Sequence, residues 1–300
     1  MKETQHRLDV HQAITDRIVQ SIEDGGAGTF RMPWNQAGAT GLPTNIASGK
    51  HYNGINILAL WVASLSLGYT RPIWGTYRQW QDKGAQVRKG EKASLVVFYK
   101  TFTVDSEGDT EQENGTAERM FARASYVFNA DQVEGFTPTD PLPALPRFEP
   151  MEAAERFAQR AGAVIREGGS MACYSPSDDI IRMPDRIRFN GTSTMTAGEA
   201  YYATLMHELT HWTGAESRCA RDLKNRFGSE AYAMEELVAE LGAAFLCADL
   251  GVTPEPRDDH AQYIANWLKV LKQDKKAIFT AASRAQAAVN FLNERLAMLG

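Results

Sequence analysis

Two histidines and a glutamate stand in a pattern that is typical of metal-dependent hydrolysis. His207, Glu208 and His211 occur in YYATLMHELTHWTG, which covers residues 201–214. On a helix, side chains four residues apart share a face, so both imidazoles can bind one ion. Glu208 lies about 100° further round, where it can reach a water beside the ion. About 0.01 such matches are expected by chance in this composition, which disfavours a helix that merely contains two histidines.

A catalytic zinc takes a third protein ligand and leaves one position open. No third histidine follows at a suitable spacing, but the segment YAMEELVAELGAAFL (232–246) supplies glutamates. Glu236 and Glu240 share a helix face, whereas Glu235 lies about 100° away. We predict Glu236 as the third ligand and Glu240 as the acceptor that holds a ligand histidine. Glu230 is a weaker alternative ligand, and a solvated helix face is the structural alternative for all the glutamates of this segment.

A site of this kind would act as a peptidase. The ion acidifies a water, Glu208 takes its proton, and Glu208 later returns a proton to the leaving amine. The developing oxyanion needs a donor, for which Tyr232 and His260 are both candidates that the sequence does not separate. The segment CYSPSDDIIRMPD (173–185) is predicted to supply an edge strand that holds an extended peptide above the metal.

Helices must position these residues, and the second half of the chain is predicted to be mainly helical. A strand is predicted at residues 178–183. Apolar periodicity and capping residues place helices near residues 151–161, 197–213, 229–250, 258–271 and 276–298.

The first half is predicted to combine helices and strands. An amphipathic helix carries Ile14, Ile18 and Ile22 on one face and ends at Gly25. Two further helices are predicted from about residue 56 and over residues 76–83. Runs rich in β-branched and aromatic residues at 94–104 and 120–130 predict antiparallel strands, joined by a polar, mobile loop at 105–118.

Length and proline content predict two domains. The chain has 300 residues, and residues 137–150 hold five of its twelve prolines. Proline disfavours helix in the residue before it, so this stretch is predicted to be extended. The predicted fold class is α+β, with an N-terminal α+β domain at 1–137, a Pro-rich linker at 138–150 and a mainly helical domain at 151–300.

Composition predicts a cytoplasmic protein without a membrane partner. Hydrophobic residues make up 43% and charged residues 23% of the chain, as in soluble globular proteins. The longest apolar run, residues 56–68, is too short to cross a bilayer, and the first residues lack the apolar core of a secretory signal. The three cysteines lack paired spacing, which suits a reducing compartment.

The charge of the chain is unevenly distributed. The formal net charge is −5, yet residues 31–100 hold nine Lys and Arg against two Asp and Glu. Four of the six tryptophans also lie there. Rings interleaved with cations are what single-stranded nucleic acid requires, because bases stack on rings and cations follow phosphates. The alternative is buried tryptophans and solvated lysines. No recognition helix for duplex DNA is apparent, so single strands are favoured.

Several separate stretches resemble one protein family. The N-terminal stretches are similar to the first domain of ArdC-type plasmid antirestriction proteins, and a related domain begins some plasmid-encoded primases. They are PWN (33–35), LPTNIASGKHYNGIN (42–56) and WGTYRQWQDKGAQVRKGEK (74–92). YSPSDDIIRMP (174–184) and the two helical segments quoted above resemble the second half of that family. The resemblance implies a single-stranded-DNA-binding domain, a zincin-like metallopeptidase domain and protection of incoming conjugative DNA from host restriction.

The resemblance also implies roles for particular residues. His207, Glu208 and His211 fit the zincin motif, and Glu236 with Glu240 resembles the paired acidic residues of gluzincins, although the second is usually Asp there. A zinc peptidase is implied, with another divalent metal as the alternative. The residues expected to contact DNA are Trp34, Asn45, Lys50, Tyr52, Asn53, Trp74, Tyr77, Arg78, Arg88, Lys89 and Lys92.

The expected partners are single-stranded DNA and a protein, which would be either a peptidase substrate or a restriction-related host protein. The competing interpretation is a non-catalytic DNA-binding protein. In that case the zincin-like domain would be a metal-bound scaffold or an interaction module.

Overall fold

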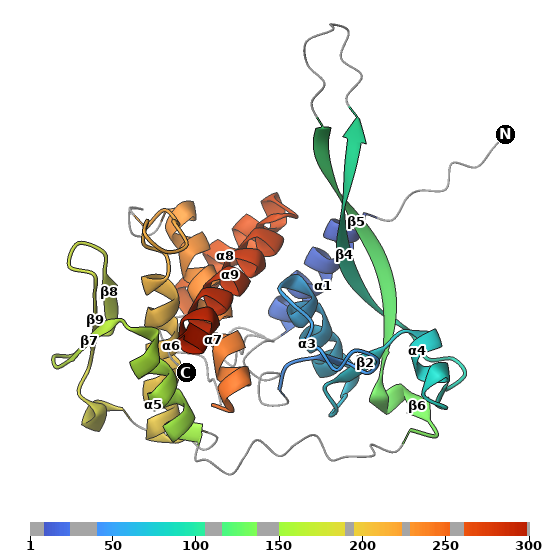
Figure 1. Ribbon diagram of the computed structural model, residues 1–300, viewed down its shortest axis with the longest axis horizontal. Helices are drawn as coiled ribbons and strands as arrows, with labels where there is room; N and C mark the ends of the chain where they lie inside the picture. The colour runs from blue at the N-terminus through green and yellow to red at the C-terminus, as the bar shows by residue number, and fades with distance from the viewer. Residues whose placement is uncertain are drawn as a thin grey trace, which may run out of the picture.

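A computed structural model describes residues 9–24, 41–105, 116–136, 150–189, 195–223, 229–252 and 261–298. It shows two domains that lie side by side (Figure 1). The N-terminal domain mixes helices with short sheets, and the C-terminal domain is mainly helical. The predicted α+β class is therefore confirmed. Within the described part of the chain, no helix has the length and apolar character needed to cross a bilayer.

Helices α1 (Val10–Asp24) and α3 (Ile55–Leu67) pack together in the N-terminal domain. The face of α1 that carries Ile14, Ile18 and Ile22 is buried, as its periodicity predicts. Helix α3 ends at Gly68, whose φ of 70° is one that glycine adopts without strain. The short helix α4 (Tyr77–Asp82) begins with a capping box between Thr76 and Gln79. These three helices correspond to the three predicted from the sequence.

The sheet of this domain has the order β1-β2-β5-β4. Its strands are β1 (Thr44–Asn45), β2 (Ile73–Gly75), β4 (Ser94–Asp105) and β5 (Thr116–Asn129). Strands β4 and β5 form the predicted antiparallel hairpin, which projects from the domain in Figure 1. Most of the predicted loop between them lies outside the described residues. Strands β3 (Gln86–Val87) and β6 (Val133–Glu134) form a second, two-stranded sheet.

The C-terminal domain combines five helices with one small sheet in its described part. The helices are α5 (Pro150–Ala161), α6 (Ala197–Trp212), α7 (Glu230–Leu250), α8 (Ala261–Gln273) and α9 (Ala277–Met298). The strands β7 (Val164–Glu167), β8 (Cys173–Ser175) and β9 (Ile180–Met183) pair in the order β7-β9-β8. Strand β8 therefore forms an edge. All five helices were predicted. Of the three strands, β9 was predicted, β8 lies within the segment 173–185 that was predicted to supply an edge strand, and β7 was missed.

One continuous cluster of buried apolar side chains extends through both domains. The rings of Trp61 on α3 and Phe245 on α7 have centroids 5.9 Å apart. The Thr15 hydroxyl donates to the carbonyl of Lys275 at 2.8 Å, which links α1 to the segment before α9. Residues 137–149, which hold most of the predicted linker, lie outside the described part, so the domain limits stay predictions. The domains nevertheless share a core.

Candidate functional site

Close packing of α6 against α7 brings the candidate metal-binding residues together. Helix α6 begins at Thr196, which forms a capping box with Glu199, and α7 begins after the N-cap Ser229. Gly242 on α7 lies against α6, and a Cβ atom there would stand only 2.5 Å from the Cγ2 atom of Thr210. The glycine therefore lets the two helices approach closely enough for glutamates of α7 to meet histidines of α6.

Three side chains converge at this contact. The Nε2 atoms of His207 and His211 are 3.2 Å apart. His207 Nε2 lies 3.5 Å from Oε2 of Glu236, and His211 Nε2 lies 3.5 Å from its other oxygen, Oε1. Zinc binds such atoms at about 2.0–2.2 Å, so two tetrahedral ligand atoms should stand roughly 3.3–3.6 Å apart. The two imidazole nitrogens lie close to that range, and one ligand atom from each of the three residues lies within 4.8 Å of the other two. His207, His211 and Glu236 could thus hold a divalent metal after a small adjustment of their side chains.

A carboxylate stands behind each imidazole. Glu240 lies 3.6 Å from Nδ1 of His207, and Glu235 lies 3.1 Å from Nδ1 of His211. The hydrogen bond with Glu235 holds the His211 ring, and Glu240 faces the outer nitrogen of His207, so that both Nε2 atoms point to the centre. The sequence prediction included Glu240 but set Glu235 aside because of its angle on α7. Glu235 contacts His211 because Nδ1 of that ring, the nitrogen that points away from the centre, faces the side of α7 that carries Glu235.

Electrostatics at the centre favour protonated imidazoles when no metal is bound. Burial alone would lower the pKa of His211, but Glu235 and Glu236 outweigh it and raise that pKa to about 10. The pKa of His207 is also raised, because Glu236 and Glu240 overcome the effect of burial. Burial would raise the pKa of Glu236, yet the two histidines lower it. A metal ion must therefore displace protons from this site.

Glu208 lies beside the centre and is 4% exposed. Its carboxylate accepts a hydrogen bond from the backbone amide of Tyr174 on β8 at 2.8 Å. Strand β8, which forms an edge of the sheet, is thus held next to the candidate base. It lies within residues 173–185, the segment predicted to supply an edge strand. Whether that edge holds a peptide stays a prediction.

Arg218 fastens this edge strand to α6. Its guanidinium lies 4.0 Å from the ring centroid of Trp212 and donates to the Trp212 carbonyl at 2.6 Å. It also donates to the Tyr174 hydroxyl at 3.0 Å and to the carboxylate of Asp179. No local sequence pattern indicates this role, because these residues are far apart along the chain.

Arg221 supports the histidine side of the centre. Its side chain is 4% exposed and donates to both carboxylate oxygens of Glu235, at 2.9 and 3.0 Å. Arg221, Glu235 and His211 therefore form a chain of contacts that ends at the candidate metal position. The weaker alternative ligand Glu230 does not belong to this centre, since it forms an exposed ion pair with Lys269 at 3.0 Å. His260 lies outside the described residues, and Tyr232 is half-buried in the first turn of α7.

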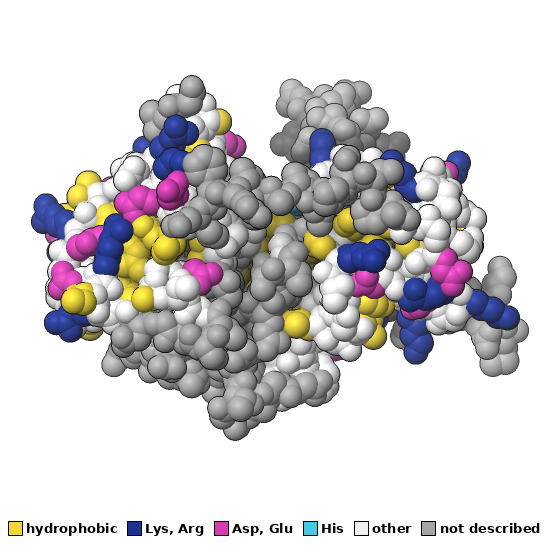
Figure 2. All heavy atoms as spheres, turned by 90° about the horizontal axis from the view of Figure 1, so that it is seen from below, with side chains coloured by type: hydrophobic (Ala, Val, Ile, Leu, Met, Phe, Trp, Pro, Cys, Tyr) yellow, Lys and Arg dark blue, Asp and Glu magenta, His cyan; other side chains and the backbone are white. Residues whose placement is uncertain are grey.

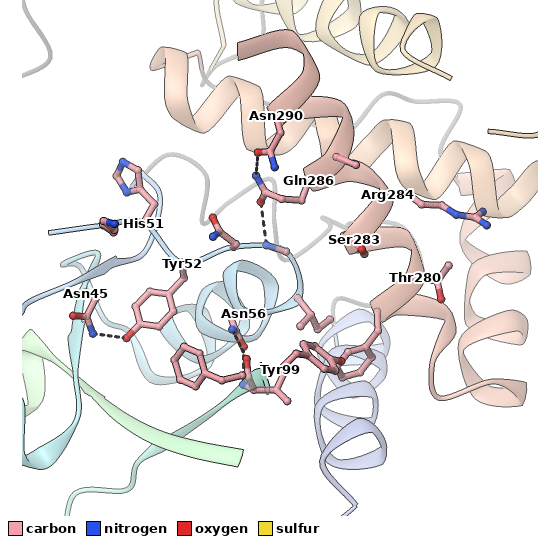
Figure 3. Close-up of a pocket in the computed structure, with 18 of the residues that line it drawn as sticks. Asn45, His51, Tyr52, Asn56, Tyr99, Thr280, Ser283, Arg284, Gln286 and Asn290 are labelled. Carbon is pink, nitrogen blue, oxygen red and sulfur yellow. Dashed lines mark hydrogen bonds between the residues drawn. The ribbon is translucent and has the colours of Figure 1, made fainter. Parts of the chain in front are cut away.

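Four of the residues expected to contact DNA line one cavity between the domains. Asn45, Lys50, Tyr52 and Asn53 contribute to a cavity of about 1120 Å³, which is drawn in Figure 3. The Tyr52 ring is buried, and its hydroxyl accepts from the Asn45 amide at 3.1 Å. Tyr52 therefore shapes the cavity wall and cannot offer an open face to a base.

A second, smaller cavity gathers three more of the expected residues. Tyr77, Arg88 and Lys89 line about 570 Å³ together with Glu91 and Glu134. Arg88 forms an ion pair with Glu91 at 2.8 Å. The two carboxylates balance the two cations of this cavity, which weakens its attraction for phosphate.

The remaining expected DNA contacts are distributed differently. Arg78 and Lys92 are exposed and line neither cavity. The Trp74 ring is fully buried and packs edge-on against Tyr69, so the expectation that it stacks on DNA is wrong for this conformation. Trp34 lies outside the described residues. Among the described residues on the face shown in Figure 2, Lys and Arg are interspersed with Asp and Glu and form no single basic patch.

Comparisons with known protein families agree with this two-domain organisation. Residues 8–128 match the N-terminal domain of the anti-restriction factor ArdC, and residues 152–284 match a zincin-like metallopeptidase domain. Protein y4eC of Sinorhizobium fredii is 48% identical over 289 residues, which cover 95% of this chain and 92% of that protein. A DNA primase TraC of Escherichia coli is 37% identical, and the alignment covers 94% of this chain but 27% of the primase.

Solved structures give the same result. The metal-free crystal structure of the antirestriction protein ArdC from plasmid R388 is 37% identical and superposes with a TM-score of 0.77, covering 97% of this chain and 99% of that one. The Mn(II)-bound structure of the same protein has a TM-score of 0.75 and 38% identity, and the match covers 98% and 100% of the chains. The matching domains, the full-length relatives and the shared fold together show that the chain belongs to the ArdC family of antirestriction proteins.

Proposed function

We propose that the chain binds single-stranded DNA, protects incoming plasmid DNA from restriction, and carries a zinc-dependent peptidase site. The ligands would be His207, His211 and Glu236, and Glu208 would be the base. The observation that supports the site best is the convergence of His207, His211 and Glu236, which can each offer one ligand atom within 4.8 Å of the others. Family membership supports the antirestriction function.

The nature of the ligands supports zinc. Two imidazoles and one carboxylate form the ligand set of several zinc peptidases, which leave a fourth position open. The related ArdC protein was crystallised with Mn(II), and a carboxylate ligand is compatible with that ion as well. Zinc is therefore the proposed metal, and manganese is the alternative.

The reaction assigned to this site is hydrolysis of a peptide bond. The bound metal would supply a Lewis acid that polarises the attacked carbonyl and acidifies water. Glu208 would accept the proton from the attacking water and deliver it to the leaving amine. The hydrogen bond that Glu208 accepts from the Tyr174 amide at 2.8 Å holds the carboxylate in one orientation. The carboxylates behind His207 and His211 would keep the imidazoles in place while charge develops.

The metal and base assignments are tested by pairing metal content with hydrolysis. The wild-type protein, Glu208→Gln and a His207→Ala/His211→Ala variant are loaded with zinc and assayed by elemental analysis. Casein cleavage is then measured with and without single-stranded DNA and a chelator. Glu208→Gln should keep one metal per chain and lose roughly 100-fold or more of the rate. Full metal content in the double variant would refute the ligand set.

The antirestriction function needs a separate assay. Plasmid transfer into restricting and non-restricting hosts is compared with and without the protein. Equal transfer into both hosts in its presence supports protection, and an unchanged difference between the hosts contradicts it. Protection by a Glu208→Gln variant combined with no casein cleavage by wild type would favour the scaffold interpretation.

A further inference from the structure

The larger cavity is built by both domains. The loop before α3 and strand β4 of the N-terminal domain form one wall, and α9 of the C-terminal domain forms the other (Figure 3). The Gly54 amide donates to the Gln286 side chain at 3.0 Å, which joins the two walls at one point. The cavity, at about 1120 Å³, exceeds the roughly 300–1,000 Å³ of typical small-molecule pockets. A segment of a polymer fits it better than a single metabolite.

The positive charge of the cavity favours an anionic polymer as its ligand. The chain contains 37 Asp and Glu, yet none occurs among the described residues that line this cavity. Lys50 contributes a cation from one wall. Lys276, which directly precedes α9, and Arg284 on α9 contribute two from the other wall. No carboxylate among the described residues forms an ion pair with any of these three side chains. All three are exposed to solvent. Phosphates could therefore bind them without breaking existing pairs.

The rest of the lining suits unpaired bases. Phe98 and Tyr99 on β4 are 46% and 45% exposed, so their rings are available for stacking. Amide side chains are frequent in the walls, including Asn53 and Asn290, whose oxygen accepts from Gln286 at 3.0 Å while its amide nitrogen can still donate. Such groups can hydrogen-bond to the edges of unpaired bases without selecting a single sequence. Of the two cavities described above, only this one combines exposed rings, amide side chains and cations that form no ion pair with a described carboxylate.

We propose that single-stranded DNA passes through the cavity between the domains and that α9 completes its binding site. Lys50 would contact phosphate from the N-terminal wall, and Lys276 and Arg284 from the C-terminal wall. Tyr99 would stack on a base. This inference rests on the proposed single-strand binding and adds to it, because the C-terminal domain becomes part of the DNA site.

The test measures binding of a fluorescein-labelled oligothymidine by the full-length chain. Wild type is compared with Lys276→Gln/Arg284→Gln at several salt concentrations. Each lost phosphate contact reduces the slope of log K against log salt by about 0.7, so two contacts reduce it by about 1.4. At 0.1 M salt this corresponds to roughly 25-fold weaker binding. A matched control, Arg156→Gln/Arg166→Gln, removes two exposed cations of the same domain that do not line the cavity and should leave affinity and slope unchanged.

Different results separate the failure of this inference from the failure of the proposed function. If wild type does not bind the oligonucleotide, the proposed DNA binding itself is wrong. If wild type binds and the α9 variant keeps the wild-type affinity and slope, the inference is overturned. Thermal unfolding of both variants checks their folding. Photocrosslinking of a 5-iodouracil oligonucleotide to wild type gives a second readout. Crosslinks at Tyr99 or within 280–290 support the inference, and crosslinks confined to 77–91 overturn it.

Discussion

Replacement of Arg221 by methionine tests how the histidine side of the centre is supported. The Arg221 guanidinium donates to both oxygens of Glu235, to the Thr213 hydroxyl at 2.9 Å and to the Thr210 carbonyl at 2.6 Å. Methionine fills a similar volume without a charge. Arg221→Met therefore leaves the Glu235 carboxylate, which is 8% exposed, with His211 as its remaining charged neighbour.

The magnitude follows from breaking a buried ion pair. Such a change typically costs about 3–5 kcal/mol, because a charge is left buried without its partner. In the metal-free protein the raised pKa of His211 keeps that ring protonated, and it offsets part of the loss. We expect the free energy of unfolding to fall by about 3 kcal/mol. Adding Glu235→Gln removes the stranded charge and should recover roughly half of this loss.

The free energies of unfolding of wild type, Arg221→Met, Glu235→Gln and the double variant are measured by urea unfolding at pH 7 with chelator, followed by tryptophan fluorescence. Zinc affinity of the same variants is measured by competition with a chromophoric chelator, and Arg221→Met should bind about 10–100-fold more weakly. Arg188→Met is the control, because its pair with Asp185 at 3.9 Å is exposed and should contribute less than about 1 kcal/mol. A loss below about 1 kcal/mol for Arg221→Met, without coupling to Glu235→Gln, would refute the supporting role.

Two further predictions concern the contact between α6 and α7. Gly242→Ala gains about 1 kcal/mol of helix propensity, but its Cβ would stand 2.5 Å from Thr210 Cγ2, so overpacking of about 1–3 kcal/mol should dominate and destabilise the protein. Thr210→Ala in the same background should restore stability in thermal unfolding, and failure to restore it would place the strain elsewhere. The pKa of both His207 and His211 is raised in the folded protein, so both stabilise the metal-free fold fully below the unfolded pKa of about 6.5. The contribution of His211 is lost as pH rises towards its folded pKa of about 10, and thermal unfolding across this pH range should show the loss of stability. Zinc must displace these protons, so calorimetry at pH 7 in buffers of different ionisation enthalpy should detect proton release, and its absence would contradict the assigned ligands.

The helices of the chain could be predicted because their local signals agree with their packing. Helix α6 shows the reason most clearly, since Thr196 and Glu199 mark its start and the apolar residues before His207 fix its buried face. Strand β7 escaped prediction, and β8 was covered only by the longer edge segment 173–185. The two strands have four and three residues and only partial burial, so no alternation of polar and apolar side chains develops.

The candidate site could be predicted only where its residues share a helix. The spacing of His207, His211, Glu236 and Glu240 expresses helix geometry directly. Arg221 could not be found in this way, because it follows α6 in a segment without regular structure and meets Glu235 only after α7 folds back. Composition was also ambiguous for aromatic residues. It predicted an exposed Trp74, whereas the fold places that ring in the core.

The same limitation applies to the cavity between the domains. Lys50 and Arg284 are 234 positions apart in the sequence, and no local pattern relates them. Only the packing of α9 near α3 and β4 brings them to opposite walls.

Helix α9 has a geometric consequence for the proposed activities. One of its faces lines the cavity, while the alanines and Ile278 of its buried face pack in the core where α9 lies along α7. Helix α7 carries Glu236, so α9 and α7 would lie between a bound strand and the metal, and the axes of such packed helices are about 8–10 Å apart. Because the two domains share one core, the distance between the cavity and the metal position is fixed. If a protein is cleaved at the metal while DNA occupies the cavity, the cleaved segment must therefore lie only two helices away from the bound strand.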